Sequence, residues 1–161
     1  MFKNIIIYRL EMARKVLFIC VQNSFRSQIA EALFNANPPA GWVAISAGPK
    51  PADRVNPKAV QLMKERKIDI SGKTPRKLAG EMEAEADIAV IVCSGSECPV
   101  VNVKHVENWE IEDPAGKSLE GARKIVDEIW KKVSDLIERI ARGEAPVEEE
   151  RPSFSLGGSI F

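Results

Sequence analysis

Short apolar runs alternate with segments of helical periodicity, and this alternation limits the fold more than any other feature of the sequence. The run 15–20 is short and almost continuously apolar, which is typical of a buried strand. Similar runs at 43–46 and 88–92 predict two further strands, and a weaker pattern around 103–111 predicts a fourth. Strands that alternate with helices favour an α/β domain built on a parallel sheet.

Helical patterns occupy four of the intervening and following stretches. The first helical pattern follows the loop after Cys20. The other three begin at Asn56-Pro57, at Thr74-Pro75 and near Ser118. Each of the two pairs ending in proline is typical of an N-cap residue followed by proline at the first helical position. We expect the helix at Pro57 to run to about Lys67, and the one at Thr74-Pro75 to be shorter.

With 161 residues, the chain is long enough for one domain with a single sizeable core. We assign that domain to residues 14–141 and treat 1–13 and 142–161 as terminal extensions. The last extension turns from acidic to apolar. It is interpreted either as a frayed terminus or as a segment that docks on the domain or on a neighbouring subunit.

Charge and hydropathy exclude several classes of partner. Lysine plus arginine number 23 and aspartate plus glutamate also number 23, so the net charge gives no basis for binding nucleic acid or an anionic membrane. No apolar run is long enough for a transmembrane helix or a signal peptide, which predicts a cytoplasmic protein. In that compartment the three cysteines rest as thiols, and a disulfide is more often catalytic than structural.

The loop after the first strand has the features of an anion site. Cys20 ends the strand, and Arg26 stands at the start of the following helical pattern. Backbone N–H groups at a helix N-terminus bind anions, and an arginine fork fits a tetrahedral oxyanion. The same field favours the thiolate of Cys20, to which Ser27 can donate a hydrogen bond. The oxyanion-binding residues are expected to be Val21, Gln22, Asn23, Ser24, Phe25 and Arg26.

A simpler interpretation of the loop is a core cysteine at the end of a strand, followed by an exposed arginine. The positions of two cysteines bear on this choice. Cys20 and Cys93 each follow a predicted strand, and the carboxyl ends of parallel strands meet at one edge of the sheet, where ligands bind. The two thiols are therefore predicted to share a site.

Several separated motifs within residues 15–140 resemble one known family. The matching segments are Cys20-Val-Gln-Asn-Ser-Phe-Arg26-Ser27-Gln28, Ser46-Ala47-Gly48, 51–57, 68–71, Cys93 to Cys98-Pro99, and Asp113-Pro114-Ala115-Gly116. In these segments the chain resembles the low-molecular-weight protein tyrosine phosphatases and, among them, the thioredoxin-coupled arsenate reductases. The resemblance implies a three-layer sandwich with a four-stranded parallel sheet.

The resemblance also implies a set of roles. Cys20 would bond arsenate, Cys93 would attack Cys20 and release arsenite, and Cys98 would attack Cys93, giving a disulfide that thioredoxin reduces. Asp113 would be the general acid. The catalytic residues expected on this basis are Cys20, Arg26, Ser27, Cys93, Cys98 and Asp113.

The sequence departs from the family pattern at two places. Phe25 stands where relatives commonly carry a second loop cysteine, and Ala115 stands where phosphatases usually carry a tyrosine. The chain has a single tyrosine, so aromatic walls that would grip a phosphotyrosine ring are hard to find. This absence favours a small inorganic oxyanion as the substrate.

No cofactor is required by these roles. Some family members hold a potassium ion beside the loop, and Asn23, Glu31 and Ser46 match its ligands in part. The alternative for these positions is an N-cap-like asparagine and a solvated glutamate. His105 is the only histidine, which excludes a site with several histidine ligands.

Two other functions are compatible with the sequence. The first is a phosphatase that hydrolyses a phosphoester through a Cys20 phosphocysteine, for which Cys20, Arg26 and Asp113 suffice. The second is a thiol module without turnover, such as a redox sensor or an arsenite-binding protein. The pair Cys93 and Cys98 favours the reductase, because reducing arsenate takes two electrons and two thiols supply them by forming a disulfide.

Overall fold

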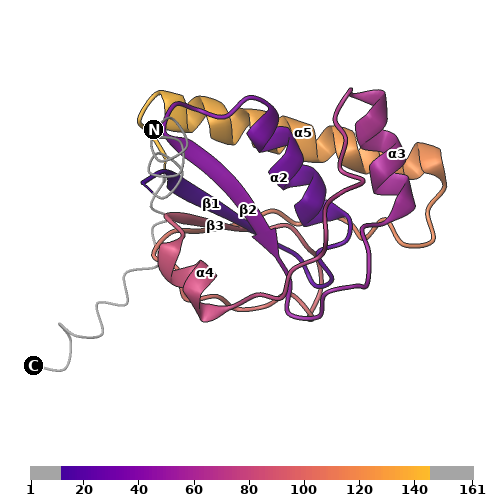
Figure 1. The fold of residues 1–161 in the computed structure, drawn as a ribbon, viewed down its shortest axis with the longest axis horizontal. Helices are drawn as coiled ribbons and strands as arrows, with labels where there is room; N and C mark the ends of the chain where they lie inside the picture. The colour runs from indigo at the N-terminus through magenta and orange to yellow at the C-terminus, as the bar shows by residue number, and fades with distance from the viewer. Residues whose placement is uncertain (1–11, 146–161) are drawn as a thin grey trace, which may run out of the picture.

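The computed structural model describes residues 12–145, and the arrangement of its helices and strands is drawn in Figure 1. Helices and strands follow one another along the chain in the predicted order, with two consecutive helices before the third strand and the fourth strand directly after the third. In chain order the elements are β1 (Arg14–Ile19), α2 (Arg26–Ala36), β2 (Trp42–Ala47), α3 (Pro57–Glu65), α4 (Gly80–Glu85), β3 (Ile88–Ile91), β4 (Val106–Asn108) and α5 (Leu119–Ala141). The α/β fold is confirmed.

The four strands form one sheet in the order β2-β1-β3-β4, and all neighbouring strands are parallel. β1 and β3 therefore lie in the middle. The residues Val16–Ile19 and Ile88–Val90 have no exposed surface. A parallel sheet is covered on both faces, which explains why these strands are continuously apolar rather than alternating.

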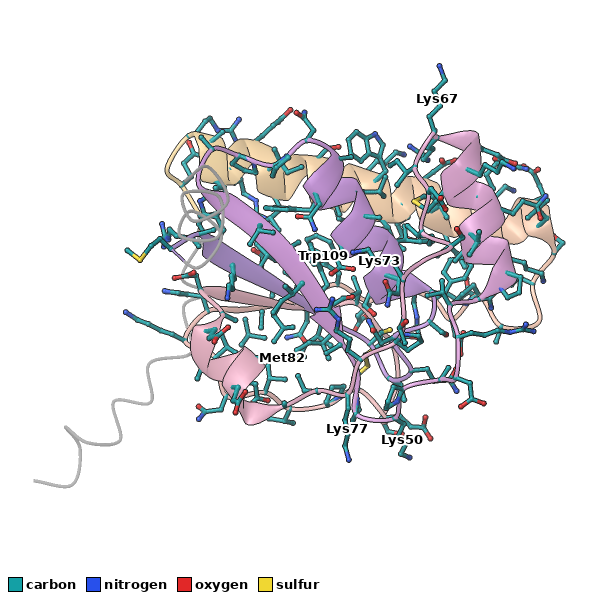
Figure 2. The ribbon with its side chains drawn as sticks, viewed as in Figure 1. Lys50, Lys67, Lys73, Lys77, Met82 and Trp109 are labelled. Carbon is teal, nitrogen blue, oxygen red and sulfur yellow. A yellow bond between two sulfur atoms is a disulfide. The ribbon has the colours of Figure 1, made fainter. Side chains whose placement is uncertain are left out.

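Helices cover both faces of the sheet, which gives the predicted three layers. α2, α3 and α5 pack on one face and the short α4 on the other (Figure 1). The long helix α5 buries an apolar stripe against α2 that includes Ile129, Val133 and Leu136. On the opposite face, Met82 of α4 points toward the sheet (Figure 2), where it packs against a buried cluster that includes Leu17 and Ala89.

Two predicted helix starts are confirmed in detail. The Asn56 side chain accepts a hydrogen bond from the Lys58 N–H at 2.9 Å, and Ser118 Oγ accepts one from the Gly121 N–H at 3.1 Å. Such caps satisfy N–H groups that have no partner within the helix. α3 ends at Glu65 rather than at Lys67, because Lys67 has a φ of 62° and lies in the left-handed region.

Two expectations about local structure need correction. No helix forms at Thr74-Pro75, because this segment bonds to the loop after β1 and to α2 instead: the Arg76 N–H donates to Asn23 Oδ1 and the Thr74 carbonyl accepts from Gln28. The helix of this region begins later, at Gly80. The fourth strand is also shorter than predicted and spans only Val106–Asn108.

The apolar segment at the end of the chain, for which a docking role was considered, lies outside the described residues. So do residues 1–11 of the predicted N-terminal extension. Within residues 12–145, none of the helices combines the length and the apolar character needed to cross a membrane.

Candidate active site

The loop that joins β1 to α2 has its backbone oriented as an anion cradle. The carbonyl groups of Val21, Gln22 and Ser24 all accept hydrogen bonds from backbone N–H groups in the segment 50–56. The N–H that follows each carbonyl lies on the opposite side of its planar peptide unit. The N–H groups after these three carbonyls are therefore directed away from that segment. They are free to bind an anion, as in other backbone nests.

Gly48 fixes the distance between this loop and the neighbouring strand. A Cβ atom at position 48 would lie 2.5 Å from the carbonyl oxygens of both Cys20 and Val21, a distance that real Cβ contacts do not reach. Only glycine therefore lets the loop pass this close. Gly48 belongs to the sequence motif Ser46-Ala47-Gly48. Its steric role could not be predicted, because the sequence does not give the distance between Gly48 and the loop.

The Cys20 thiol is buried and hydrogen bonded at the base of the loop. Its side chain is 3% exposed, and Cys20 Sγ lies 2.8 Å from Ser27 Oγ. Ser27 Oγ accepts a hydrogen bond from Asn23 Nδ2 at 2.7 Å, so its own proton is free to point at the sulfur. The contact predicted between Ser27 and Cys20 is present, and it lets Ser27 donate a hydrogen bond to the sulfur.

A cavity of about 420 Å³ opens above Cys20 and contains most of the predicted site. Its walls come from the loop, the start of α3, the segment after β3 and the turn that carries Asp113. The lining residues are Cys20, Val21, Gln22, Ser24, Phe25, Arg26, Asn56, Ser94, Gly95, Ser96, Glu97, Asp113, Pro114 and Ala115. Asn23 and Ser27 are not among the lining residues, and both are fully buried.

Arg26 and Asp113 approach the cavity from different elements. Arg26 is the first residue of α2, is 7% exposed, and donates through Nη1 to the Ile111 carbonyl at 2.9 Å. Asp113 is exposed, and its Oδ1 accepts a hydrogen bond from the Ala115 N–H at 2.9 Å. That Asx turn leaves the second carboxylate oxygen free for a ligand or a proton.

Cys20 and Cys93 lie together at one edge of the sheet, as predicted, and Cys98 packs beside them. Ile19 and Ile91 are paired across β1 and β3, and Cys20 and Cys93 follow these strands. Both thiols belong to a small buried cluster with Ile91, against which the half-buried Cys98 packs. Cys93 and Cys98 are joined by a disulfide, and Cys20 is the free cysteine.

A polar network lies under the loop and includes the buried Glu31. The Glu31 carboxylate accepts a hydrogen bond from Ser46 Oγ at 3.3 Å and lies 3.9 Å from the Lys73 ammonium. Burial raises the pKa of the Glu31 carboxyl above its usual 4.5, while the charges of Lys73 and Arg76 and the bonds from Ser46 oppose this rise. The sequence pattern did not indicate Lys73 as a partner.

These contacts do not fit a potassium ion shared by Asn23, Glu31 and Ser46. Asn23 Oδ1 already accepts two hydrogen bonds, from Gln28 at 3.0 Å and from the Arg76 N–H at 2.8 Å. The Glu31 carboxylate already faces an ammonium group. In the described part of the chain, no cluster of histidine, cysteine, aspartate or glutamate side chains has the composition of a metal site.

Comparison with known proteins places the chain among relatives of the same architecture. The model of the low molecular weight phosphotyrosine protein phosphatase family matches residues 15–145. Arsenate reductase 2 of Staphylococcus saprophyticus is 40% identical over 124 residues, which cover 74% of this chain and 93% of the relative.

Two solved structures extend this comparison. The arsenate reductase from Archaeoglobus fulgidus superposes with a TM-score of 0.67 at 37% identity, covering 76% of this chain and 98% of the other. A thioredoxin-dependent arsenate reductase from Corynebacterium glutamicum superposes with a TM-score of 0.69 at 28% identity, covering 88% of this chain and 73% of the other. From the family match, the fold and the loop at Cys20, we conclude that this chain belongs to the low molecular weight phosphotyrosine protein phosphatase family.

Proposed function

We propose that this protein is an arsenate reductase that works through Cys20, Cys93 and Cys98. The observation that carries the proposal is the arrangement of the three sulfur atoms: a free buried thiol faces the anion cavity, and the other two form a disulfide in the adjoining segment. This is the state expected at the end of a reductive cycle. The similarity to arsenate reductases over most of the chain supports the same activity.

In the first step, arsenate binds to the free N–H groups of the loop and to the Arg26 guanidinium. The Cys20 thiolate displaces one arsenate oxygen, which leaves as water, and forms a sulfur–arsenic(V) bond. Asp113, which lines the same cavity, supplies a proton to the departing oxygen. Ser27 stabilises the thiolate before this attack, through its 2.8 Å contact with Cys20 Sγ.

The second step transfers the electrons. The Cys93 thiolate attacks Cys20 Sγ, a sulfur–sulfur bond forms, and the electron pair of the sulfur–arsenic bond stays on arsenic. Arsenic(V) thereby becomes arsenic(III) and leaves as arsenite. Cys98 then attacks Cys93 Sγ and Cys20 departs as a thiolate, which gives the Cys93–Cys98 disulfide. Two thiols have lost two electrons in total, and arsenic has gained them.

A dithiol protein such as thioredoxin returns the two electrons. Of the three cysteines, Cys20 and Cys93 are each 3% exposed, whereas Cys98 is half-buried and so the more accessible sulfur. The thioredoxin dependence of the similar Corynebacterium glutamicum enzyme supports this donor class.

Phosphoester hydrolysis is a second candidate activity, because Cys20, Arg26 and Asp113 line one cavity and need no further thiol. The two activities are separated by one assay and one variant. We expect arsenate-dependent NADPH consumption in the presence of thioredoxin and thioredoxin reductase, and its loss in Cys93→Ser. A parallel reaction with glutathione and glutaredoxin distinguishes the donors.

Hydrolysis of an aryl phosphate by the same two proteins serves as the control. Phosphatase turnover should survive Cys93→Ser, since hydrolysis does not use that thiol. Rapid phosphate release together with no arsenate-dependent NADPH consumption would identify a phosphatase and refute the reductase.

A further inference from the structure

The cavity that would bind arsenate contains an acidic residue that the proposed chemistry does not use. Glu97 lines the cavity together with Cys20 and Arg26, and it belongs to the segment between the two disulfide-bonded cysteines. Among the lining residues, Arg26 is the only one with a positive charge, whereas Glu97 and Asp113 are both acidic. Asp113 is the proton donor in the proposed chemistry. Glu97 has no role in that chemistry, and its negative charge opposes the binding of an anion.

The position of Glu97 is tied to the redox state of the protein. The Cys93–Cys98 bond closes a short ring that contains Ser94, Gly95, Ser96 and Glu97, with the Cα atoms of the two cysteines 6.0 Å apart. Within this ring the Cys98 N–H donates to the Gly95 carbonyl at 3.4 Å, and Gly95 has a φ of 90°. Opening the disulfide releases the segment from this constraint, because a short loop loses most of its conformational freedom when its ends are joined.

We propose that Glu97 makes the oxyanion pocket sensitive to the redox state of the Cys93–Cys98 pair: the disulfide holds the Glu97 carboxylate at the cavity wall, where it repels arsenate or phosphate, and reduction lets it move away. The role in an arsenate cycle rests on the function proposed above, but the binding effect itself does not. Arsenite leaves as uncharged arsenous acid and is not repelled.

A repulsion of this kind lowers the occupancy of the oxidised protein by an anion that it cannot reduce. Coulomb energies for unit charges at cavity distances, in a solvent-exposed site, correspond to about a three- to tenfold change in affinity. The coupling must be reciprocal: if the reduced protein binds the anion more tightly, the bound anion makes the disulfide easier to reduce. A tenfold preference would raise the reduction potential of the pair by about 30 mV at saturating anion.

The test measures the binding of inorganic phosphate by calorimetry to the full chain, once with the Cys93–Cys98 disulfide intact and once fully reduced. We expect phosphate to bind about three- to tenfold more weakly to the oxidised protein. Glu97→Gln should remove most of this difference by raising the affinity of the oxidised form, with little effect on the reduced form. Glu97→Asp should keep a difference of the same sign.

Glu81→Gln is the matched control, because Glu81 is an exposed glutamate of α4 outside the cavity lining and its removal changes the net charge by the same amount. It should leave the ratio of the two affinities unchanged. Equal phosphate affinities in the two redox states of the wild type would overturn the proposal. So would an effect of Glu97→Gln that is the same in both states or no larger than that of Glu81→Gln.

The outcome is independent of the arsenate assay. A redox-dependent affinity that disappears in Glu97→Gln would support the proposal even if the protein failed to reduce arsenate. Conversely, active arsenate reduction with redox-independent phosphate binding would leave the proposed function intact and refute the role of Glu97.

Discussion

Arg26 Nη1 donates a hydrogen bond of 2.9 Å to the Ile111 carbonyl, which joins the first residue of α2 to the segment that carries Asp113. One guanidinium thus lines the anion cavity and fixes the position of the turn that supplies the proposed acid. A guanidinium can do both because its five N–H donors point in fixed directions.

Arg26→Lys should therefore be a severe substitution although it keeps the charge. A lysine ammonium cannot hold the Ile111 carbonyl and grip an oxyanion with a planar fork at the same time. We expect a loss of about a hundredfold in turnover, the scale seen when one oxyanion donor is removed. Steady-state arsenate reduction measures it, and thermal unfolding reports whether the fold is preserved. Turnover within threefold of the wild type would contradict this role of Arg26.

Ser27→Ala should make the Cys20 sulfur a less reactive nucleophile. The variant removes the hydroxyl 2.8 Å from Cys20 Sγ, and hydrogen bonds to charged groups contribute about 1.5–3 kcal/mol. Alkylation of Cys20 by iodoacetamide should slow about tenfold. Ser71→Ala, at an exposed serine that bonds only to Asp69, is the control and should leave the rate unchanged. An alkylation rate that is equal in the wild type and Ser27→Ala would exclude this stabilisation.

Gly48→Ala should displace the anion loop. The added Cβ would meet the backbone oxygens of Cys20 and Val21 at 2.5 Å, and backbone cannot rotate away as a side chain can. We expect a destabilisation of about 1–3 kcal/mol, as for other overpacked sites, and a marked loss of phosphate affinity. Gly72→Ala is the matched control, since no atom lies within 4 Å of a Cβ there. Chemical denaturation and calorimetry measure the two effects, and a variant with normal phosphate affinity would refute the steric argument.

Glu31 should make stability depend on pH in an unusual direction for a carboxyl group. Burial raises the pKa of Glu31 above its usual 4.5, so the folded protein binds a proton that the unfolded chain releases. Between the unfolded and folded pKa values, the free energy of unfolding therefore falls as pH rises. Below that window the protonated side chain carries no penalty, and above it the full cost of the buried charge is present.

Glu31→Gln tests this contribution, because the amide has nearly the same shape and does not titrate. Urea unfolding from pH 4 to pH 8 should show a smaller loss of stability with rising pH in the variant than in the wild type. Glu128→Gln, at an exposed glutamate on α5, should retain the wild-type profile. Identical profiles for the wild type and Glu31→Gln would show that the cations around Glu31 compensate fully for its burial.

The sequence predicted those parts of the fold that depend on local patterns. Apolar runs located β1, β2 and β3, and the side chains of Asn56 and Ser118 marked two helix starts that the structure confirms. The Thr74-Pro75 signature failed because its backbone groups bond to Asn23 and Gln28, residues distant in the sequence. Local propensity is overridden wherever such long-range hydrogen bonds are available.

The same distinction applies to the site. Cys20 and Arg26 were recognisable because the strand, loop and helix that position them are consecutive. The places of Gly48, Ile111 and Glu97 at the site depend on distances between segments that are far apart in the chain, and no periodicity encodes such distances. Lys73 was missed for the same reason, since only the folded chain brings its ammonium near Glu31.

The depth of Cys20 has a practical consequence for purified protein. Once Cys93 and Cys98 are joined, the chain retains one free thiol, and that thiol is 3% exposed. Two folded molecules cannot bring such buried sulfur atoms within bonding distance, so storage in air should yield no covalent dimers through Cys20. The oxidised protein is in this respect the form best suited to long handling, because its nucleophile is shielded from the thiols of other protein molecules and from bulky oxidants.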